Sequence, residues 1–188
     1  MTAVYERMVD VFEKYPEIFG HYKIELLRGD IVMMAGPDRV HNINVLLIER
    51  QIPLDRWYPL QTQDIALPGE ESEPQPDLVV IEQGAFEGPG RLVDGPAAAL
   101  LVEVVSKNSG HYDYEIKRRI YAAGRVPAYL IVDPFAAQCV LLTEPVGAGD
   151  EADYSVQRTT KFGDPVPLDM LGVTLDTSAL LTLPGKPR

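Results

Sequence analysis

The segment Ala97-Ala-Ala-Leu-Leu-Val-Glu103-Val-Val105 is the longest apolar stretch of the chain, and the expected fold is built around it. From Leu100 to Val105 it is a continuous apolar run with one glutamate, a pattern typical of a strand buried on both faces of a sheet. A second run of this kind, Leu78-Val-Val-Ile81, lies upstream. We expect these two strands to be neighbours in one sheet.

The regions around these strands predict helices and further strands. Tyr22–Leu27 and Ile31–Met34 flank a tight Arg28-Gly-Asp turn, which is typical of a β-hairpin. Asp38 is a suitable N-cap for a helix that runs to about Gln51. Further helices are expected at Ala3–Tyr15, at Tyr112–Ala123 and after Thr177, and further strands at Trp57–Gln61, Ile65–Leu67, Tyr129–Val132, Cys139–Leu142 and Tyr154–Arg158. This order predicts a single α/β or α+β domain over residues 1–188, with helices packed on a sheet.

Composition excludes several classes of protein. The chain has 188 residues with 17 Lys+Arg, 28 Asp+Glu and a formal net charge of -11, which is unsuited to a polybasic nucleic-acid binder. A hydrophobic fraction of 46% excludes a disordered chain. No apolar stretch reaches the ~20 residues of a membrane helix, and the N-terminus lacks a signal peptide. Because Cys139 is the only cysteine, we expect a cytoplasmic protein without membrane partners.

Charge is distributed unevenly along the chain. The segment Gln61–Asp94 holds eight acidic residues and one basic residue, whereas Val105–Arg125 holds five basic and two acidic residues. The basic segment follows directly after the strand that carries Glu103. Net charge therefore argues against broad nonspecific binding of DNA. It allows a localised site whose affinity depends on a metal ion and falls with salt.

Glu103 stands out because an ionised carboxylate in a buried strand needs an opposite charge, a metal ion or a proton. Asp77 opens the neighbouring strand, directly after Pro76. Two carboxylates on adjacent strands can converge on a hard cation such as Mg²⁺. Two structural alternatives stay open here: Asp77 belongs to a simple turn, or Glu103 pairs with Lys107 or Arg118.

The predicted helix after this strand adds a second element to the site. Asp113, Lys117 and Tyr121 recur at intervals of four residues, so they lie along one stripe of the helix. Ile116 and Ile120 form the apolar stripe beside it. This places Lys117 on the shoulder of the buried face, where its side chain can reach the sheet. The alternative is that Asp113 and Lys117 form an ordinary surface ion pair.

Five segments, in this order and spacing, resemble the Uma-type family of restriction-endonuclease-like proteins in the PD-(D/E)XK nuclease superfamily. The segments are Tyr22-Lys-Ile-Glu-Leu-Leu-Arg-Gly-Asp-Ile-Val-Met-Met-Ala-Gly-Pro37, Gln75-Pro-Asp-Leu-Val-Val-Ile81, Leu100-Leu-Val-Glu-Val-Val-Ser106, Asp113-x3-Lys117-x3-Tyr121 and Val126-Pro-Ala-Tyr-Leu-Ile-Val-Asp-Pro134. The resemblance implies a restriction-endonuclease-like core at about residues 20–145. That core is a central mixed β-sheet flanked by helices, with an N-terminal helix and a β-hairpin.

The resemblance also implies a site and its chemistry. Asp77 and Glu103 would hold Mg²⁺ or Mn²⁺ together with the backbone carbonyl of Val104. Lys117 would orient the water that attacks a phosphodiester bond of DNA, or stabilise charge in the transition state. Glu25 matches the family's additional acidic residue. The resemblance gives supporting roles in the site to His41, Asp113 and Tyr121.

One departure from the superfamily pattern affects the lysine. The usual Glu-x-Lys motif would place lysine at position 105, where this chain has Val105. Related families carry the lysine on the following helix, which matches Lys117, with Lys107 as a competing candidate.

The sequence is consistent with two functions. The first is that of a Mg²⁺-dependent endonuclease acting on DNA, which we expect to be a homodimer because a duplex has two strands to cut. The alternative is a catalytically silent interaction or regulatory domain with the nuclease fold.

Overall fold

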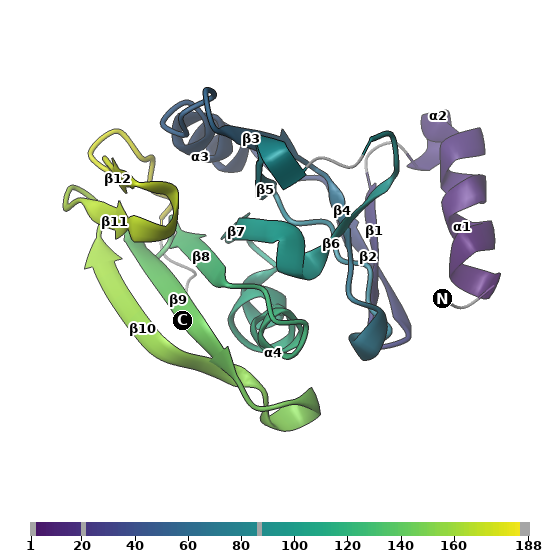
Figure 1. Ribbon diagram of the computed structural model, residues 1–188. Helices are drawn as coiled ribbons and strands as arrows, with labels where there is room; N and C mark the ends of the chain where they lie inside the picture. Colours follow the sequence, from purple (N-terminus) through teal and green to yellow (C-terminus); the bar gives the residue numbers. More distant parts are fainter. Residues whose placement is uncertain (1–2, 20–21, 86–87, 185–188) are drawn as a thin grey trace.

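The computed structural model describes residues 3–19, 22–85 and 88–184, and its centre is a six-stranded sheet (Figure 1). In spatial order β10-β9-β8-β7-β5-β3, the strands are β10 (Asp153–Lys161), β9 (Gln138–Val146), β8 (Ala128–Asp133), β7 (Ala98–Val104), β5 (Leu78–Glu82) and β3 (Trp57–Gln61). β7 and β8 run parallel, and the other neighbouring pairs are antiparallel. The predicted mixed sheet, with β5 and β7 as neighbours, is confirmed.

Strand β7 is buried on both faces, as its apolar run predicts. Leu100, Val102 and Val104 face one apolar cluster, and Leu101 and Val105 face another on the opposite side. Helix α3 (Arg39–Glu49) contributes to the first cluster, and helix α4 (Lys117–Ala123) contributes to the second. Side chains alternate between the faces of a strand, so Glu103 points to the α4 side. Its carboxylate is therefore enclosed between the sheet and this helix.

Helix α3 begins at the predicted cap. The Asp38 carboxylate accepts a hydrogen bond of 3.0 Å from the backbone N–H of His41, which satisfies one of the unpaired donors of the first turn. The helix ends at Glu49, near the predicted end. This cap fixes the first turn of α3 and, with it, the position of the buried His41 side chain.

The N-terminal elements lie at one end of the molecule, and the β9–β10 ribbon lies at the other (Figure 1). The N-terminal elements are α1 (Ala3–Lys14), the short α2 (Pro16–Phe19) and the hairpin of β1 (Tyr22–Leu27) with β2 (Asp30–Ala35). The predicted N-terminal helix and β-hairpin are confirmed. Within the described part of the chain, no helix has the length and apolar character required to span a bilayer.

The predicted helix at Tyr112–Ala123 is divided into two parts. Residues Tyr112–Ile116 form a π-helical turn, and α4 continues from Lys117 to Ala123, with Gly124 as the C-cap. A π-helical turn is rare and is often found at functional sites. Here it widens the helix directly before Lys117.

Two predictions at the level of elements need correction. Residues 177–184 contain no helix, so the helix expected after Thr177 is wrong. Before this segment the chain forms a hairpin of β11 (Val166–Leu168) and β12 (Val173–Leu175), which was not predicted and whose buried side chains join the apolar cluster on the α3 face. The short strand β4 (Asp64–Ala66) overlaps the predicted strand Ile65–Leu67, and it pairs in parallel with β6 (Leu92–Asp94), where no strand was predicted.

Candidate active site

Four parts of the chain bring charged side chains together beside the sheet. Lys23 and Glu25 lie two residues apart on β1 and therefore point to the same side of that strand. Asp77 immediately precedes β5, and Glu103 lies on β7. Lys117 begins α4. We call these five residues the ion cluster.

Lys117 is held between two carboxylates. Its Nζ lies 2.7 Å from Glu103 Oε1 and 2.9 Å from Glu25 Oε1, and all three side chains are buried. Burial opposes the charged form of an amine, but the neighbouring carboxylates outweigh it, so the pKa of Lys117 is well above its ordinary value. The side chain is thus a fixed ammonium group. The alternative of a surface ion pair between Asp113 and Lys117 is wrong, because both residues are buried.

Glu103 has a second fixed hydrogen-bond donor. The Tyr121 hydroxyl donates to Glu103 Oε1 at 2.8 Å, and the Tyr121 ring packs edge-on against Tyr129 with 4.9 Å between centroids. Burial raises the pKa of Glu103, and the opposing attraction of Lys117 does not fully cancel it. These contacts occupy Oε1, so Oε2 is the oxygen of Glu103 that faces Lys23, at 3.8 Å.

Glu25 is fully buried, and its two oxygens differ. Oε1 accepts a hydrogen bond of 2.7 Å from the backbone N–H of Gln75 and contacts the Lys117 ammonium. Burial opposes ionisation, but Lys117 and Lys23 outweigh it, so the pKa of Glu25 is lowered. Oε2 is buried and has no hydrogen-bond partner among the described residues. An acceptor of this kind is rare in a folded protein and marks a place where a further donor or cation would be accommodated.

Asp77 is oriented by two donors on one oxygen. His41 Nε2 donates to Asp77 Oδ2 at 2.9 Å, and the backbone N–H of Val104 donates to the same oxygen at 2.8 Å. Burial opposes ionisation of Asp77, but the Lys23 and His41 interactions hold its pKa well below the ordinary value. An extended residue presents its N–H and C=O on the same edge of the strand, so the Val104 carbonyl lies on the Asp77 side.

Asp113 lies on the same helical stripe, beside the ion cluster. Its Oδ2 accepts a hydrogen bond from the Ser109 hydroxyl, and the Tyr129 hydroxyl donates to its backbone carbonyl at 3.0 Å. Burial, followed by the negative charge of Glu103, raises the pKa of Asp113 to about 8. This carboxyl is therefore neutral at pH 7, unlike Asp77.

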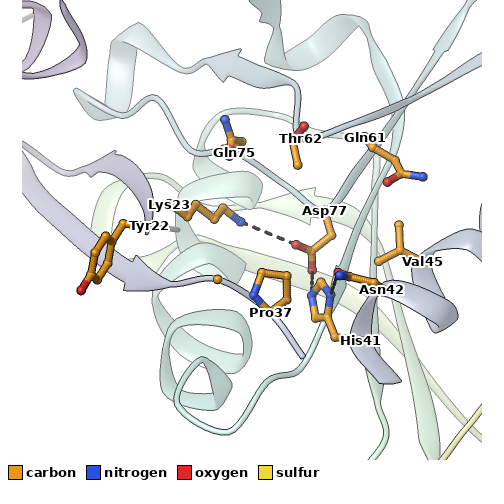
Figure 2. A pocket seen from close by; sticks show the side chains of 11 residues that line it. Tyr22, Lys23, Pro37, His41, Asn42, Val45, Gln61, Thr62, Gln75 and Asp77 are labelled. Carbon is orange, nitrogen blue, oxygen red and sulfur yellow. Dashed lines mark hydrogen bonds and ion pairs between the residues drawn. The ribbon is translucent and has the colours of Figure 1, made fainter. Parts of the chain in front are cut away.

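Two neighbouring cavities are lined by these groups. A small one of about 50 Å³ lies between Glu103, Asp113 and Lys117. A larger one of about 670 Å³ opens beside it, and Lys23, His41 and Asp77 line both. Figure 2 shows Lys23 directed at the Asp77 carboxylate from the left and His41 directed at it from below. The larger cavity is of the size that ligand sites usually have.

The family model described as "Putative restriction endonuclease" (Uma2) matches residues 9–178. This chain belongs to that family. The "Uncharacterized protein sll1609" of Synechocystis sp. is 29% identical over 154 residues, which cover 72% of this chain and 86% of that protein. A crystal structure titled "a putative nuclease belonging to DUF820", from Anabaena variabilis, matches with a TM-score of 0.66 and 12% identity, over 84% of this chain and 88% of that chain. The second likeness concerns the fold alone.

The Uma2 family resemblance and the nuclease-like fold are thus confirmed, and the structure shows where the predicted residues lie. Asp77, Glu103, Glu25 and Lys117 meet in the ion cluster. His41, Tyr121 and Asp113 lie directly around it. Lys107 is exposed in the loop after β7, and Val105 is buried in the apolar cluster. Of the two candidate lysines, Lys117 is therefore the one that reaches the carboxylates.

The sequence interpretation missed Lys23. Its position two residues before Glu25 in a predicted strand was a usable signal, because such residues share a face. Ser109 was also missed. Its hydroxyl accepts a hydrogen bond of 2.8 Å from the backbone N–H of Ser106 and donates to Asp113, a loop contact that periodicity does not reveal.

The oxygen donors at this Uma2-family site are of the chemical type that binds a hard divalent cation. In this structure, however, lysine ammonium groups lie between them. Asp77 Oδ1, Glu103 Oε2 and the Val104 carbonyl are oxygens of the kind that Mg²⁺ prefers. Glu25 Oε2 is a further buried oxygen without a hydrogen-bond partner among the described residues. In the described residues no group of three or more His, Cys, Asp or Glu side chains is arranged to hold a metal ion. The Lys23 ammonium instead lies between the carboxylates.

Proposed function

We propose that this protein is a Mg²⁺-dependent endonuclease that hydrolyses phosphodiester bonds of DNA. One observation supports the proposal above all. Asp77, directly before β5, and Glu103, on the neighbouring strand β7, lie beside a buried lysine whose Nζ is 2.7 Å from Glu103. Membership of a family described as a restriction endonuclease is consistent with it.

Each residue of the cluster has a distinct part in the proposed chemistry. Asp77, Glu103 and the Val104 carbonyl would hold Mg²⁺, which supplies a Lewis acid and lowers the pKa of a bound water. Lys117 remains an ammonium group and orients water or stabilises negative charge at the phosphate. Glu25 holds Lys117 in place through its 2.9 Å contact.

His41 and Tyr121 position the two acidic residues. The bond from His41 Nε2 fixes one oxygen of Asp77 and leaves Oδ1 directed toward Lys23. The bond from Tyr121 fixes Oε1 of Glu103 in the same way. Donors that hold ligating groups in a single orientation reduce the reorganisation that catalysis requires.

The cavity of about 670 Å³ is the proposed route of the DNA strand. It reaches Asp77 and Lys23 at its inner end, and its wall contains the polar side chains of Asn42, Thr62 and Gln75. Polar side chains of this kind contact phosphate and sugar oxygens in protein–DNA complexes. We also propose that the active form is a homodimer, because cutting a duplex calls for two sites.

A second candidate function is that of a non-catalytic interaction domain. Two observations favour it: Val105 replaces the usual lysine, and Lys23 lies between the carboxylates. A domain of this kind would bind its partner without Mg²⁺ and would leave DNA intact.

The decisive experiment compares Asp77→Asn and Glu103→Gln with the wild-type protein in a DNA cleavage assay containing Mg²⁺. Each substitution removes a charged ligand and changes the shape of the side chain little, so we expect cleavage to fall by roughly 100-fold or more. Asp94→Asn, at an exposed position outside the site, is the matched control and should cleave normally. Full activity in Asp77→Asn and Glu103→Gln would reject the assignment, and no cleavage by the wild-type protein would favour the interaction domain.

A further inference from the structure

Lys23 and Lys117 contact the same carboxylates in different ways. Lys117 makes two short contacts of 2.7 and 2.9 Å, within hydrogen-bonding distance. Lys23 Nζ lies 3.6 Å from Glu25, 3.7 Å from Asp77 and 3.8 Å from Glu103. It is therefore almost equidistant from three acidic side chains, and none of these contacts has the length of a hydrogen bond. This central position is typical of a counterion.

The two lysines also differ in freedom to move. The Lys117 side chain is 1% exposed and is enclosed between the sheet and α4. The Lys23 side chain is 18% exposed and lines both cavities. The larger cavity, of about 670 Å³, offers space into which the Lys23 side chain can swing. Of the two ammonium groups, Lys23 is the one that can leave.

Charge balance points to what replaces Lys23. With His41 counted as neutral, three carboxylates face two ammonium groups in the ion cluster, which leaves one net negative charge and the unpartnered Glu25 Oε2. A divalent cation in place of Lys23 would neutralise the cluster. A monovalent cation would only restore the charge that Lys23 already supplies.

We propose that the Lys23 ammonium occupies the cation position of the site when no divalent ion is bound, and that the ion binds by displacing it. This inference rests on the proposed metal-dependent function. Lys23 thereby lowers the affinity for divalent ions and excludes monovalent ones. The displaced ammonium enters the larger cavity, where it is available to a phosphate of the substrate.

The test is isothermal titration calorimetry with Mn²⁺ on the wild-type protein, Lys23→Met and Lys161→Met. Methionine keeps the length of the side chain and removes its charge. We expect Lys23→Met to bind Mn²⁺ about tenfold more tightly or better, because a like charge close to a bound cation weakens binding. Lys161, exposed on β10, is the matched control, and its variant should bind as the wild type does.

The outcomes separate this inference from the proposed function. If the wild type binds Mn²⁺ and Lys23→Met binds it equally well or more weakly, the role of Lys23 is overturned, whereas the proposed metal-dependent function stands. Absence of Mn²⁺ binding in both proteins overturns the metal site itself, and the role of Lys23 with it. Tighter binding in Lys23→Met supports both.

A second measurement uses the wild-type protein and does not depend on the folding of a variant. Lysine acetylation is followed by mass spectrometry with and without saturating Mn²⁺. Displacement into the open cavity should increase the acetylation rate of Lys23 severalfold, while Lys161 stays constant and Lys117 stays protected. A Lys23 rate that Mn²⁺ leaves unchanged or decreases contradicts the displacement.

Discussion

Asp113 shows how burial can keep a single carboxyl group neutral beside a charged site. Its pKa is raised to about 8, first by burial and then by the negative charge of Glu103. Its Oδ1 has no hydrogen-bond partner within the described part of the chain. In the unfolded chain the same group ionises near its ordinary pKa of 3.8. Folding at neutral pH therefore takes up a proton at this residue.

The direction of the resulting pH dependence follows from proton linkage. The contribution of Asp113 to stability is fully present below the unfolded pKa and is lost as the pH rises toward about 8. The amide of Asp113→Asn does not titrate. As the pH rises within that window, the free energy of unfolding of the wild type should therefore fall relative to that of Asp113→Asn, by up to about 1.4 kcal/mol per pH unit. Urea unfolding at a series of pH values measures the difference. Asp94→Asn serves as the exposed control, and parallel pH profiles for Asp113→Asn and the wild type would refute the expected shift.

At the residue scale, much of the site could be predicted. A glutamate in an otherwise apolar strand and a lysine on the shoulder of a helix are local signals, and both residues lie in the ion cluster. Lys23 was harder to recognise, because its role in the site depends on which strands the β1–β2 hairpin packs against. The contacts of Lys23 on β1 with Asp77 and Glu103 are long-range, and local periodicity carries no information about them.

At the scale of elements, the connection between β9 and β10 contains two glycines with positive φ. Gly147 has a φ of 72°, and a Cβ there would lie 2.5 Å from Glu151 O and 3.1 Å from Ala152 Cα. Gly149 has a φ of 53°, and no atom lies within 4 Å of a Cβ at this position. Both positions disfavour a side chain through the backbone conformation, and only Gly147 adds a steric clash.

This pair of glycines allows a matched test. Gly147→Ala should lower the free energy of unfolding by roughly 1–3 kcal/mol more than Gly149→Ala does, because the clash at position 147 involves backbone atoms that have little room to move. Thermal or urea unfolding of the two variants measures the difference. Equal losses of stability would mean that the ribbon relaxes around the added methyl group.

The success of prediction at the element scale depended on how local the signal was. The β1–β2 turn, the Asp38 cap and the buried strands all have short-range signatures, and they were found. β11 and β12 are three residues each, contain Pro167, and are stabilised by packing on the α3 face of the sheet. A pattern search has too few residues to detect them. The predicted C-terminal helix is wrong for a different reason: the backbone of Leu181 bonds the Asn44 side chain on α3, and Leu180 packs in the apolar cluster, so long-range contacts set the path of the chain.

For the whole molecule, the net charge of -11 and the internal use of basic residues limit the contacts available to DNA. Lys117 points into the ion cluster, and Arg118 pairs with Asp153. Arg125 donates to the backbone carbonyls of Pro145 and Gly147. The basic segment after β7 therefore presents less positive charge than its sequence indicates.

We expect DNA binding to require a divalent ion and to decrease with salt. Each phosphate neutralised contributes a slope of about −0.9 in log K against log salt, and few contacts predict a slope of only about −2 to −4. Fluorescence anisotropy with a labelled duplex, with Ca²⁺ in place of Mg²⁺ to prevent cleavage, measures the slope. Tight binding in the presence of a chelator would contradict this expectation.

The ion cluster also has a consequence for the kinetics of folding. Glu25, Asp77, Glu103 and Lys117 come from segments that meet only when the β1–β2 hairpin docks on the sheet and α4 covers it. Contacts between distant segments form late, so these groups stay hydrated during the early steps of folding. Interactions absent from the folding transition state act mainly on the unfolding rate. We therefore expect the cluster to affect the lifetime of the native state more than the speed at which it forms.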